Sequence, residues 1–130
     1  MDEKNQQEIL YRLAMYEQQI QQLQQQIQAV EQGIVEISSL NLGLDDLKNK
    51  TGKEILASVG KGIFAEAKLT SENLIVDIGE KNFVKKTIPE TQEIIKEQIK
   101  KLQMVKEEMN ENLESMSEEI RDIVKGFRKE

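Results

Sequence analysis

The sequence of 130 residues contains no cysteine, no histidine and no tryptophan, and it has only one proline. Without cysteine the chain forms no disulfide and offers neither a thiol nucleophile nor a thiolate ligand for a metal ion. Without histidine it lacks the commonest general base and metal ligand of proteins. These absences argue against most kinds of enzyme, and a chain without cysteine fits a reducing, cytoplasmic compartment.

Aromatic residues are scarce at 4%, whereas charged residues make up 32% of the chain. This balance favours long amphipathic helices over a thick globular core. The net charge of -6 argues against nucleic acid as a partner, because phosphate binding requires a cationic surface. The first ten residues do not resemble a signal peptide, and no apolar run approaches the roughly 20 residues of a membrane span. We therefore expect neither a nucleic-acid nor a membrane partner.

One short segment, residues 49–54 (NKTGKE), resembles part of a phosphate-binding loop. The match fails because Leu47 stands where such a loop has its first glycine, and Glu54 stands where Ser or Thr follows the lysine. Paired carboxylates such as Glu107 and Glu108 are typical of the solvated face of a charged helix. No residue is thus a candidate for catalysis, cofactor binding or metal binding, and we expect no enzyme activity.

The first third of the chain repeats its apolar residues at alternating steps of four and three. The series is Ile9, Leu13, Tyr16, Ile20, Leu23, Ile27, Val30, Ile34 and Ile37, continued by Asn41 and Leu44. A period of 3.5 residues is typical of a left-handed coiled coil, and we call these positions the seam. The pattern predicts a helix over residues 5–50, with Asn5 and Glu8 as a capping box at its start.

The last third repeats the same spacing. Its seam positions are Ile88, Gln92, Ile95, Ile99, Leu102, Lys106, Met109, Leu113, Met116, Ile120, Ile123 and Phe127. Thr87 and Glu90 have the spacing of a capping box, and Pro89 lies in the first turn, where its missing N–H is tolerated. These signals predict a second helix over residues 88–128. Two helices of about 40 residues, roughly 60 Å each, favour an antiparallel coiled coil within one chain; a parallel homodimer is the alternative.

Between the helices, residues 54–87 alternate apolar and polar side chains in short runs bounded by glycine and asparagine. This pattern predicts two β-hairpins with turns at residues 60–62 and 79–82. Isolated hairpins are marginally stable in water and their open edges invite pairing, so we expect them to drive oligomerisation. The candidate interface residues are Ile55, Val59, Ile63, Phe64, Ala65, Leu69, Leu74, Val76, Ile78 and Phe83.

This order of helix, two hairpins and helix resembles the α-type subunits of the prefoldin family over essentially the whole chain. Residues 52–69 (GKEILASVGKGIFAEAKL) resemble their first hairpin, and residues 74–90 (LIVDIGEKNFVKKTIPE) resemble their second hairpin running into the second helix. The β-type subunits carry a single hairpin, so the second one indicates the α type. Ser58 stands where the family often has proline, which leaves open a paralogue of the α subunit. The absence of extensions resembles archaeal members.

The resemblance implies an α+β fold in a single domain, residues 1–130, whose hairpins form the barrel body of a hexamer of two α and four β subunits. It further implies an ATP-independent chaperone, a holdase, that captures non-native proteins at the coil tips and delivers them to a group II chaperonin. No catalytic residue and no cofactor are implied.

Apolar residues in excess of the seam gather near both ends of the chain. The candidate client-binding residues are Ile9, Leu10, Tyr11, Leu13, Met15, Ile123, Val124 and Phe127. Such an open apolar surface suits partly folded clients of varied sequence. The alternative is that these side chains cap the coil and pack on one another. Two other functions also stay open: a filament or homo-oligomer with a structural role, and a coiled-coil tether that binds no client.

Overall fold

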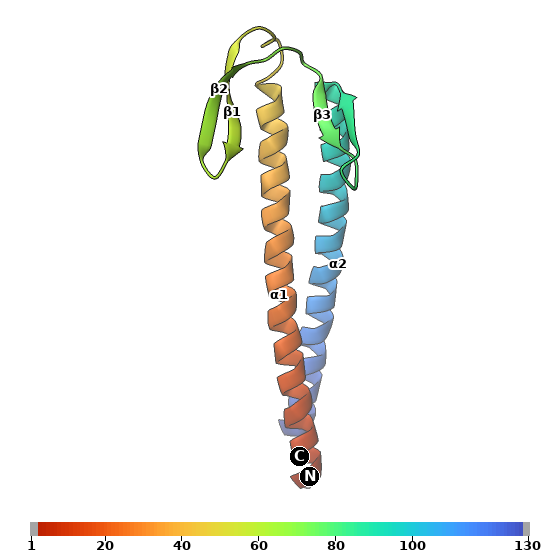
Figure 1. The fold of residues 1–130 in the computed structure, drawn as a ribbon. Helices are drawn as coiled ribbons and strands as arrows, with labels where there is room; N and C mark the ends of the chain where they lie inside the picture. The colour runs from red at the N-terminus through yellow and green to blue at the C-terminus, as the bar shows by residue number, and fades with distance from the viewer. Residues whose placement is uncertain (1–2, 129–130) are drawn as a thin grey trace. The chain divides into compact units, whose positions relative to one another are not determined.

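The computed structural model describes the backbone of residues 3–128 and the side chains of residues 3–126. The elements follow in the order α1 (Glu3–Asp45), β1 (Glu54–Gly60), β2 (Ile63–Lys68), β3 (Leu74–Asp77), β4 (Phe83–Lys86) and α2 (Ile88–Arg128) (Figure 1). The chain divides into two compact units. We call Val35–Lys100 the hairpin unit, and Met1–Ile34 together with Lys101–Glu130 the coil unit.

The bounds of α1 differ from the predicted ones at both ends. The helix is described from Glu3, so Asn5 lies inside it and the predicted capping box with Glu8 is wrong. At the other end α1 stops at Asp45 and not at residue 50. The N–H groups of Leu47 and Lys48 donate to carbonyls three residues back, at 3.1 and 3.2 Å. These shorter-range bonds tighten the chain into a turn and end the helix.

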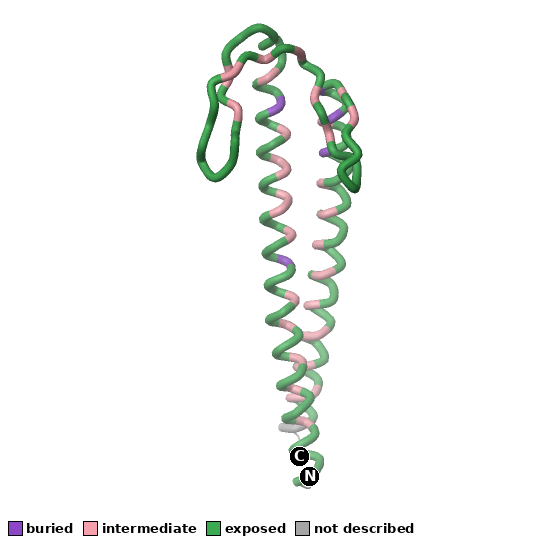
Figure 2. The backbone as a smooth tube through the Cα atoms, in the orientation of Figure 1, coloured by how far each residue is buried: buried purple, intermediate pink, exposed green. Residues whose placement is uncertain are grey.

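The predicted seam is confirmed along both helices. Every seam position from Ile9 to Leu44 and from Ile88 to Ile123 is buried or half-buried, whereas most positions between them are exposed. Figure 2 shows the resulting stripe on each helix. The 3.5-residue spacing therefore places the apolar side chains on one face of each helix, and a second helix covers that face.

The covering helix belongs to the same chain in each unit. In the coil unit the ammonium group of Lys106 lies 3.3 Å from a carboxylate oxygen of Glu31. In the hairpin unit the side-chain amide of Gln92 donates to the carbonyl of Asn41 at 3.3 Å and to Asp45 Oδ1 at 2.7 Å. Higher numbers on α1 thus meet lower numbers on α2. The intrachain antiparallel pair is confirmed, and the seam does not require a parallel homodimer.

The predicted capping box at the start of α2 is confirmed. The N–H and the hydroxyl of Thr87 both donate to Glu90 Oε1, at 3.2 and 2.9 Å, and the N–H of Glu90 donates back to Thr87 Oγ1 at 3.2 Å. These bonds satisfy main-chain groups that the helix itself cannot pair. Hydrogen bonds from the side chain and the backbone of Thr87 hold the pKa of the Glu90 carboxyl below its ordinary value of 4.5.

The strands form two separate two-stranded antiparallel sheets, β1–β2 and β3–β4. In the first, Ala57 pairs with Ala65 and Ser58 with Phe64, and the register shifts at Val59 before the turn. In the second, Val76 pairs with Val84. The two predicted hairpins are therefore confirmed.

The turn that joins β3 to β4 carries an unusual backbone. The N–H of Asn82 donates to the carbonyl of Gly79 at 2.9 Å, and the residues between them, Glu80 and Lys81, have φ angles of 49° and 64°. Positive φ at both central residues is typical of a type I′ turn, which matches the twist of a hairpin but favours glycine or asparagine. Glu80 and Lys81 therefore hold a conformation that costs a residue with a Cβ atom about 1–2 kcal/mol.

Replacing Lys81 by glycine is expected to stabilise the protein. Glycine adopts positive φ without strain, and the gain outweighs its larger entropy loss on folding, which leaves a net increase of about 0.5–1 kcal/mol in the free energy of unfolding. Urea unfolding followed by circular dichroism measures this. Lys85→Gly, in the middle of β4, is the matched control and should destabilise. A Lys81→Gly variant less stable than the parent would contradict the strained turn.

The capping box also predicts a pH dependence. The pKa of Glu90 is lower in the folded chain than in the unfolded chain, so its stabilising effect is complete above the ordinary pKa and is lost as the pH falls through the folded-state pKa. Glu90→Gln should lower the melting temperature at neutral pH, and the difference from the parent should shrink towards pH 3. Glu93→Gln, an exposed change one turn on, is the control. A difference that does not depend on pH would refute this role of the carboxylate.

Candidate assembly and client-binding surfaces

The β1–β2 hairpin exposes apolar side chains on both of its faces. Ile55, Ala57 and Ala67 share one face and are half-buried, whereas Leu56 and Phe64 on the other face are 68% and 58% exposed. Figure 2 shows most of this hairpin as exposed. In a single chain such surface is in contact with water, which is unfavourable for apolar groups.

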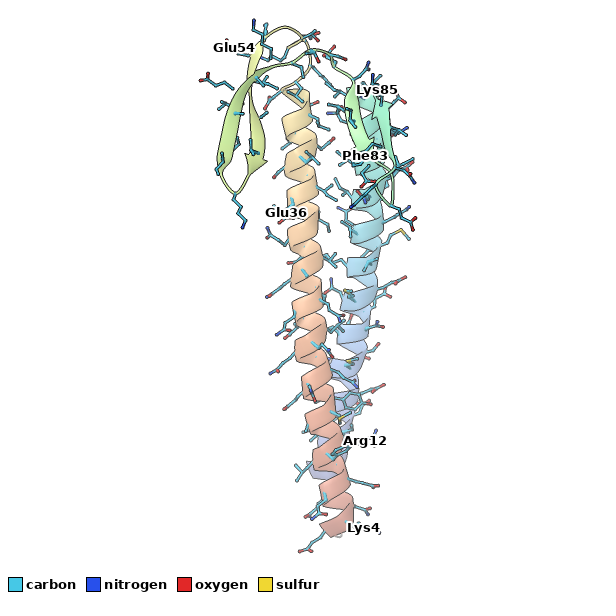
Figure 3. All side chains as sticks on the ribbon, in the orientation of Figure 1. Lys4, Arg12, Glu36, Glu54, Phe83 and Lys85 are labelled. Atoms are coloured by element: carbon cyan, nitrogen blue, oxygen red, sulfur yellow. The ribbon has the colours of Figure 1, made fainter. Side chains whose placement is uncertain are left out.

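The β3–β4 hairpin has one covered and one open face. Leu74, Val76 and Val84 are half-buried, and Leu74 packs against the core formed by Leu44, Ile88 and Ile95. The opposite face carries Ile75, Asp77, Phe83 and Lys85, all of them exposed. Phe83 and Lys85 are labelled on β4 in Figure 3. The hairpin is thus held to the helix ends by its inner face while its outer face stays uncovered.

The ten candidate interface residues fall into two groups. Four are half-buried and contribute to the inner faces: Ile55, Leu69, Leu74 and Val76. Six are exposed: Val59, Ile63, Phe64, Ala65, Ile78 and Phe83. The candidate set omitted Leu56 and Ile75, which are 68% and 70% exposed. Both residues alternate along their strands with candidate residues, which places them on the opposite face of each hairpin. The sequence therefore contained the signal for a second apolar face.

The helix ends of the hairpin unit add exposed apolar side chains that the sequence analysis did not select. Val35, Leu40 and Leu42 of α1 are 58%, 55% and 68% exposed. None of them is a seam position. Their place outside the heptad spacing was the sequence signal that could have identified them as exposed. The hairpin unit therefore exposes apolar side chains on α1 as well as on its hairpins.

The candidate client-binding residues occupy the coil unit, near the described ends of α1 and α2. Ile9 and Leu13 are half-buried in the seam, as are Ile123 and Val124 at the end of α2. The side chain of Phe127 lies outside the described residues. Three further candidates point away from the seam: Leu10, Tyr11 and Met15 are 60%, 68% and 41% exposed.

A shallow groove accompanies these residues. Arg12 and Tyr16 of α1 line it together with Glu119, Asp122 and Ile123 of α2. Arg12 and Tyr16 were not among the candidate client-binding residues. Tyr16 was predicted as a seam position only. The described end of the coil unit therefore combines open apolar side chains with one arginine beside two carboxylates.

The described residues show no cluster typical of a metal site. Residues 3–128 hold no group of three or more acidic, histidine or cysteine side chains that could bind a metal ion. Within the same range, neither helix is long and apolar enough to cross a membrane. The last residue of α1 is Asp45. The pKa of its carboxyl is lowered mainly by a hydrogen bond from Gln92 and next by one from Lys48. Residues 49–54, the partial match to a phosphate-binding loop, form the turn before β1 and its first residue.

Known proteins match this chain over most of its length. The family model described as "Prefoldin subunit" matches residues 16–129. The prefoldin subunit alpha of Methanosphaera stadtmanae is 30% identical over 95 residues, which cover 73% of this chain and 69% of that protein. The prefoldin subunit alpha of Methanobrevibacter smithii is 36% identical over 92 residues, which cover 70% of this chain and 63% of that protein.

A solved structure matches the fold. The cryo-EM structure of a filamentous PFD from Methanocaldococcus jannaschii aligns with a TM-score of 0.78 at 23% identity, covering 86% of this chain and 94% of that one. The two helices and the two hairpins between them therefore form a known architecture. The family model and the archaeal α subunits place the chain in the prefoldin family, whose members are chaperone subunits and not enzymes.

Proposed function

We propose that this chain is an α-type prefoldin subunit that acts as an ATP-independent holdase in the cytoplasm. It captures non-native proteins at the ends of its coil and delivers them to a group II chaperonin. The observation that carries the proposal is the exposure of Leu10, Tyr11 and Met15 beside a seam that is already filled. A two-helix coil needs no such side chains for its own packing, so they are available to a client.

The chemistry of these side chains suits clients of varied sequence. Tyr11 and Met15 combine a large apolar surface with one polar or polarizable atom, and methionine adapts its shape to its contacts. Apolar contact is non-directional, so it does not demand a particular client geometry. Several such tips in one oligomer would add avidity to weak individual contacts.

The proposed partners of the hairpin unit are β-type prefoldin subunits, two α with four β, assembled through the hairpins into a barrel body. Support comes from the open faces of both hairpins, which carry Leu56, Phe64, Ile75 and Phe83 in contact with water. Buried apolar surface stabilises an assembly by roughly 25 cal/mol per Å². A barrel also closes the strand edges that an isolated hairpin leaves open.

A structural role as a homo-oligomer or filament is the second candidate. The specific observation in its favour is that the matched solved structure is described as filamentous. A plain tether receives less support, because it gives no use for the exposed residues at the coil end. The mass of the assembled particle, measured with and without a β-type subunit, separates the first two candidates: a defined hexamer only in the mixture supports the chaperone subunit.

Charge placed on the open hairpin surface is expected to prevent assembly without unfolding the chain. Ile63 is 63% exposed, so Ile63→Asp disturbs little within one chain, whereas a buried and unpaired carboxylate in an interface costs several kcal/mol. Sedimentation velocity should show monomers that keep the helical circular dichroism spectrum. Lys61→Asp, in the turn two residues earlier, is the control. An unchanged particle mass for Ile63→Asp would show that this surface is not part of the interface.

Removal of the exposed apolar groups at the coil end is expected to abolish most holding activity. The triple change Leu10→Ser, Tyr11→Ser and Met15→Ser leaves the seam residues in place, so particle mass and helix content should not change. Suppression of the aggregation of a chemically unfolded client, followed by light scattering, should fall several-fold. Met104→Ser is the matched control, because Met104 is 63% exposed on α2 but is not one of the candidate residues. If the triple variant still suppressed client aggregation fully, the client-binding surface would lie elsewhere on the protein.

A further inference from the structure

The middle of α1 carries an uncharged polar surface on the outside of the coil unit. Residues 18–30 contain no charged side chain, and eight of these thirteen residues are glutamine. Five of the glutamines are exposed and lie outside the seam, and we call them the glutamine face: Gln18, Gln21, Gln24, Gln25 and Gln28. The seam positions between them are buried or half-buried. The glutamine face therefore lies outside the contact between α1 and α2.

The stretch of α2 beside this segment is, by contrast, strongly acidic. The helices are antiparallel and Lys106 pairs with Glu31, so residues 107–119 of α2 run beside residues 18–30 of α1. These residues of α2 include six glutamates and no basic side chain. A second copy of the chain would be repelled by this acidic surface, since like charges in close contact are unfavourable. The glutamine face offers the same copy an approach without that repulsion.

Four residues of the glutamine face enclose a hollow with the geometry of a helix-packing site. Gln21, Gln24, Gln25 and Gln28 line a shallow groove of about 180 Å³. Their spacing of i, i+3, i+4 and i+7 is that of the four residues that receive one side chain of a facing helix in a coiled coil. This hollow lies outside the seam, so it is open to a helix of another molecule.

The chemistry of the glutamine face favours an identical face as its partner. A glutamine carboxamide donates hydrogen bonds through its NH₂ group and accepts them through its C=O group. Two glutamine faces can therefore pair amide to amide, so that donors and acceptors match. A charged partner would lose hydration without gaining an opposite charge, and an apolar partner would cover the amides without hydrogen bonds, which is unfavourable.

We propose that the glutamine faces of two copies of this chain dock against each other and pair the two coils. The side chain of Gln25 on one copy enters the hollow of the other, and pairs of amides surround it. Both copies use the same residues, so the contact is isologous and joins copies two by two. It is separate from the hairpin surfaces, because residues 18–30 belong to the coil unit.

The strength of this contact depends on how the copies are brought together. An amide pair gains little over the hydrogen bonds that each amide makes with water, so the contact is weak between free chains. Copies that are held in one assembly have a much higher effective concentration, and the weak contact then forms. To this extent the inference rests on the proposed assembly through the hairpins, and it adds a second, reversible link between copies.

Crosslinking at the centre of the glutamine face tests the contact, and the absence of cysteine from the chain makes each introduced thiol unique. Gln25→Cys chains treated with a short bismaleimide should yield a covalent dimer. Glu111→Cys is the matched control, because Glu111 is exposed on α2 at a similar level of the coil; it should yield several-fold less dimer. Equal yields from the two variants would overturn the inference.

Charge substitution shows whether the two faces themselves meet. Gln21→Glu with Gln28→Glu places like charges in the docked pair, and Gln21→Lys with Gln28→Lys does the same with the opposite sign. The dimer yield of Gln25→Cys should fall several-fold in either background. The three residue types have similar helix propensities, so circular dichroism should not change.

Mixing the two charge variants provides the decisive comparison. Opposite charges now meet across the contact, so a mixed dimer should restore the yield, and isotope labelling of one chain identifies that dimer by its mass. A helix that had merely been disturbed by the substitutions would not recover on mixing. If the mixture yields no more dimer than the separate variants, the glutamine faces do not dock.

The Ile63→Asp change separates this contact from assembly through the hairpins. In that background the dimer yield of Gln25→Cys should fall at low chain concentration and recover as the concentration rises to about 1 mM. If the yield does not recover, the thiols met only because the hairpins held the chains together, and the inference fails. If Gln25→Cys forms no dimer in the parent assembly while Ile63→Asp still dissociates it, the inference fails and the proposed assembly stands.

Discussion

Two strands joined by one turn cannot bury both of their faces, and this constraint governs the hairpin unit. A helix can satisfy its main-chain hydrogen bonds alone, whereas each strand of a two-stranded sheet leaves one edge unpaired. The β3–β4 hairpin solves half of the problem by packing Leu74 against the core around Ile88. The β1–β2 hairpin leaves Leu56 and Phe64 mostly exposed. A second chain that covered this surface would stabilise it, and this is the physical reason for the assembly through the hairpins that we propose.

The seam is apolar except at a few polar positions, and these set the register of the helix pair. An apolar seam alone tolerates a shift by one heptad, because the same kinds of side chain meet again. Gln92 bonds to both Asn41 and Asp45, and a shift by seven residues would leave this amide without those partners. Lys106 reaches Glu31 across the coil; this exposed pair is worth little energy but is lost in any other register. A fixed register places the end of α1 and the start of α2 where they hold β3.

The elements with a strong local signal could be predicted from the sequence, and those that depend on tertiary contacts could not. The heptads fixed the buried face of both helices, and the hairpins followed from period-two alternation between glycines. The capping box of Thr87 and Glu90 needs only local geometry. The end of α1 was misplaced because the seam runs through Leu44 and gives no local signal for a stop at Asp45, while the actual stop depends on a tightened turn and on Gln92 reaching Asp45. The exposure of apolar side chains was also difficult to predict, because the sequence alone does not show what covers a residue such as Leu10 or Leu42.

The excess apolar surface has a different character in the two units, and the difference suits two kinds of partner. In the hairpin unit the open side chains accompany strand edges, whose N–H and C=O groups accept a neighbour only in certain registers. A surface of this kind selects one fixed partner. In the coil unit Leu10, Tyr11 and Met15 stand on a helix whose main chain is already hydrogen-bonded, so only side chains remain for contact. Such contact has no required register, and it therefore fits clients that share exposed apolar groups but no common structure.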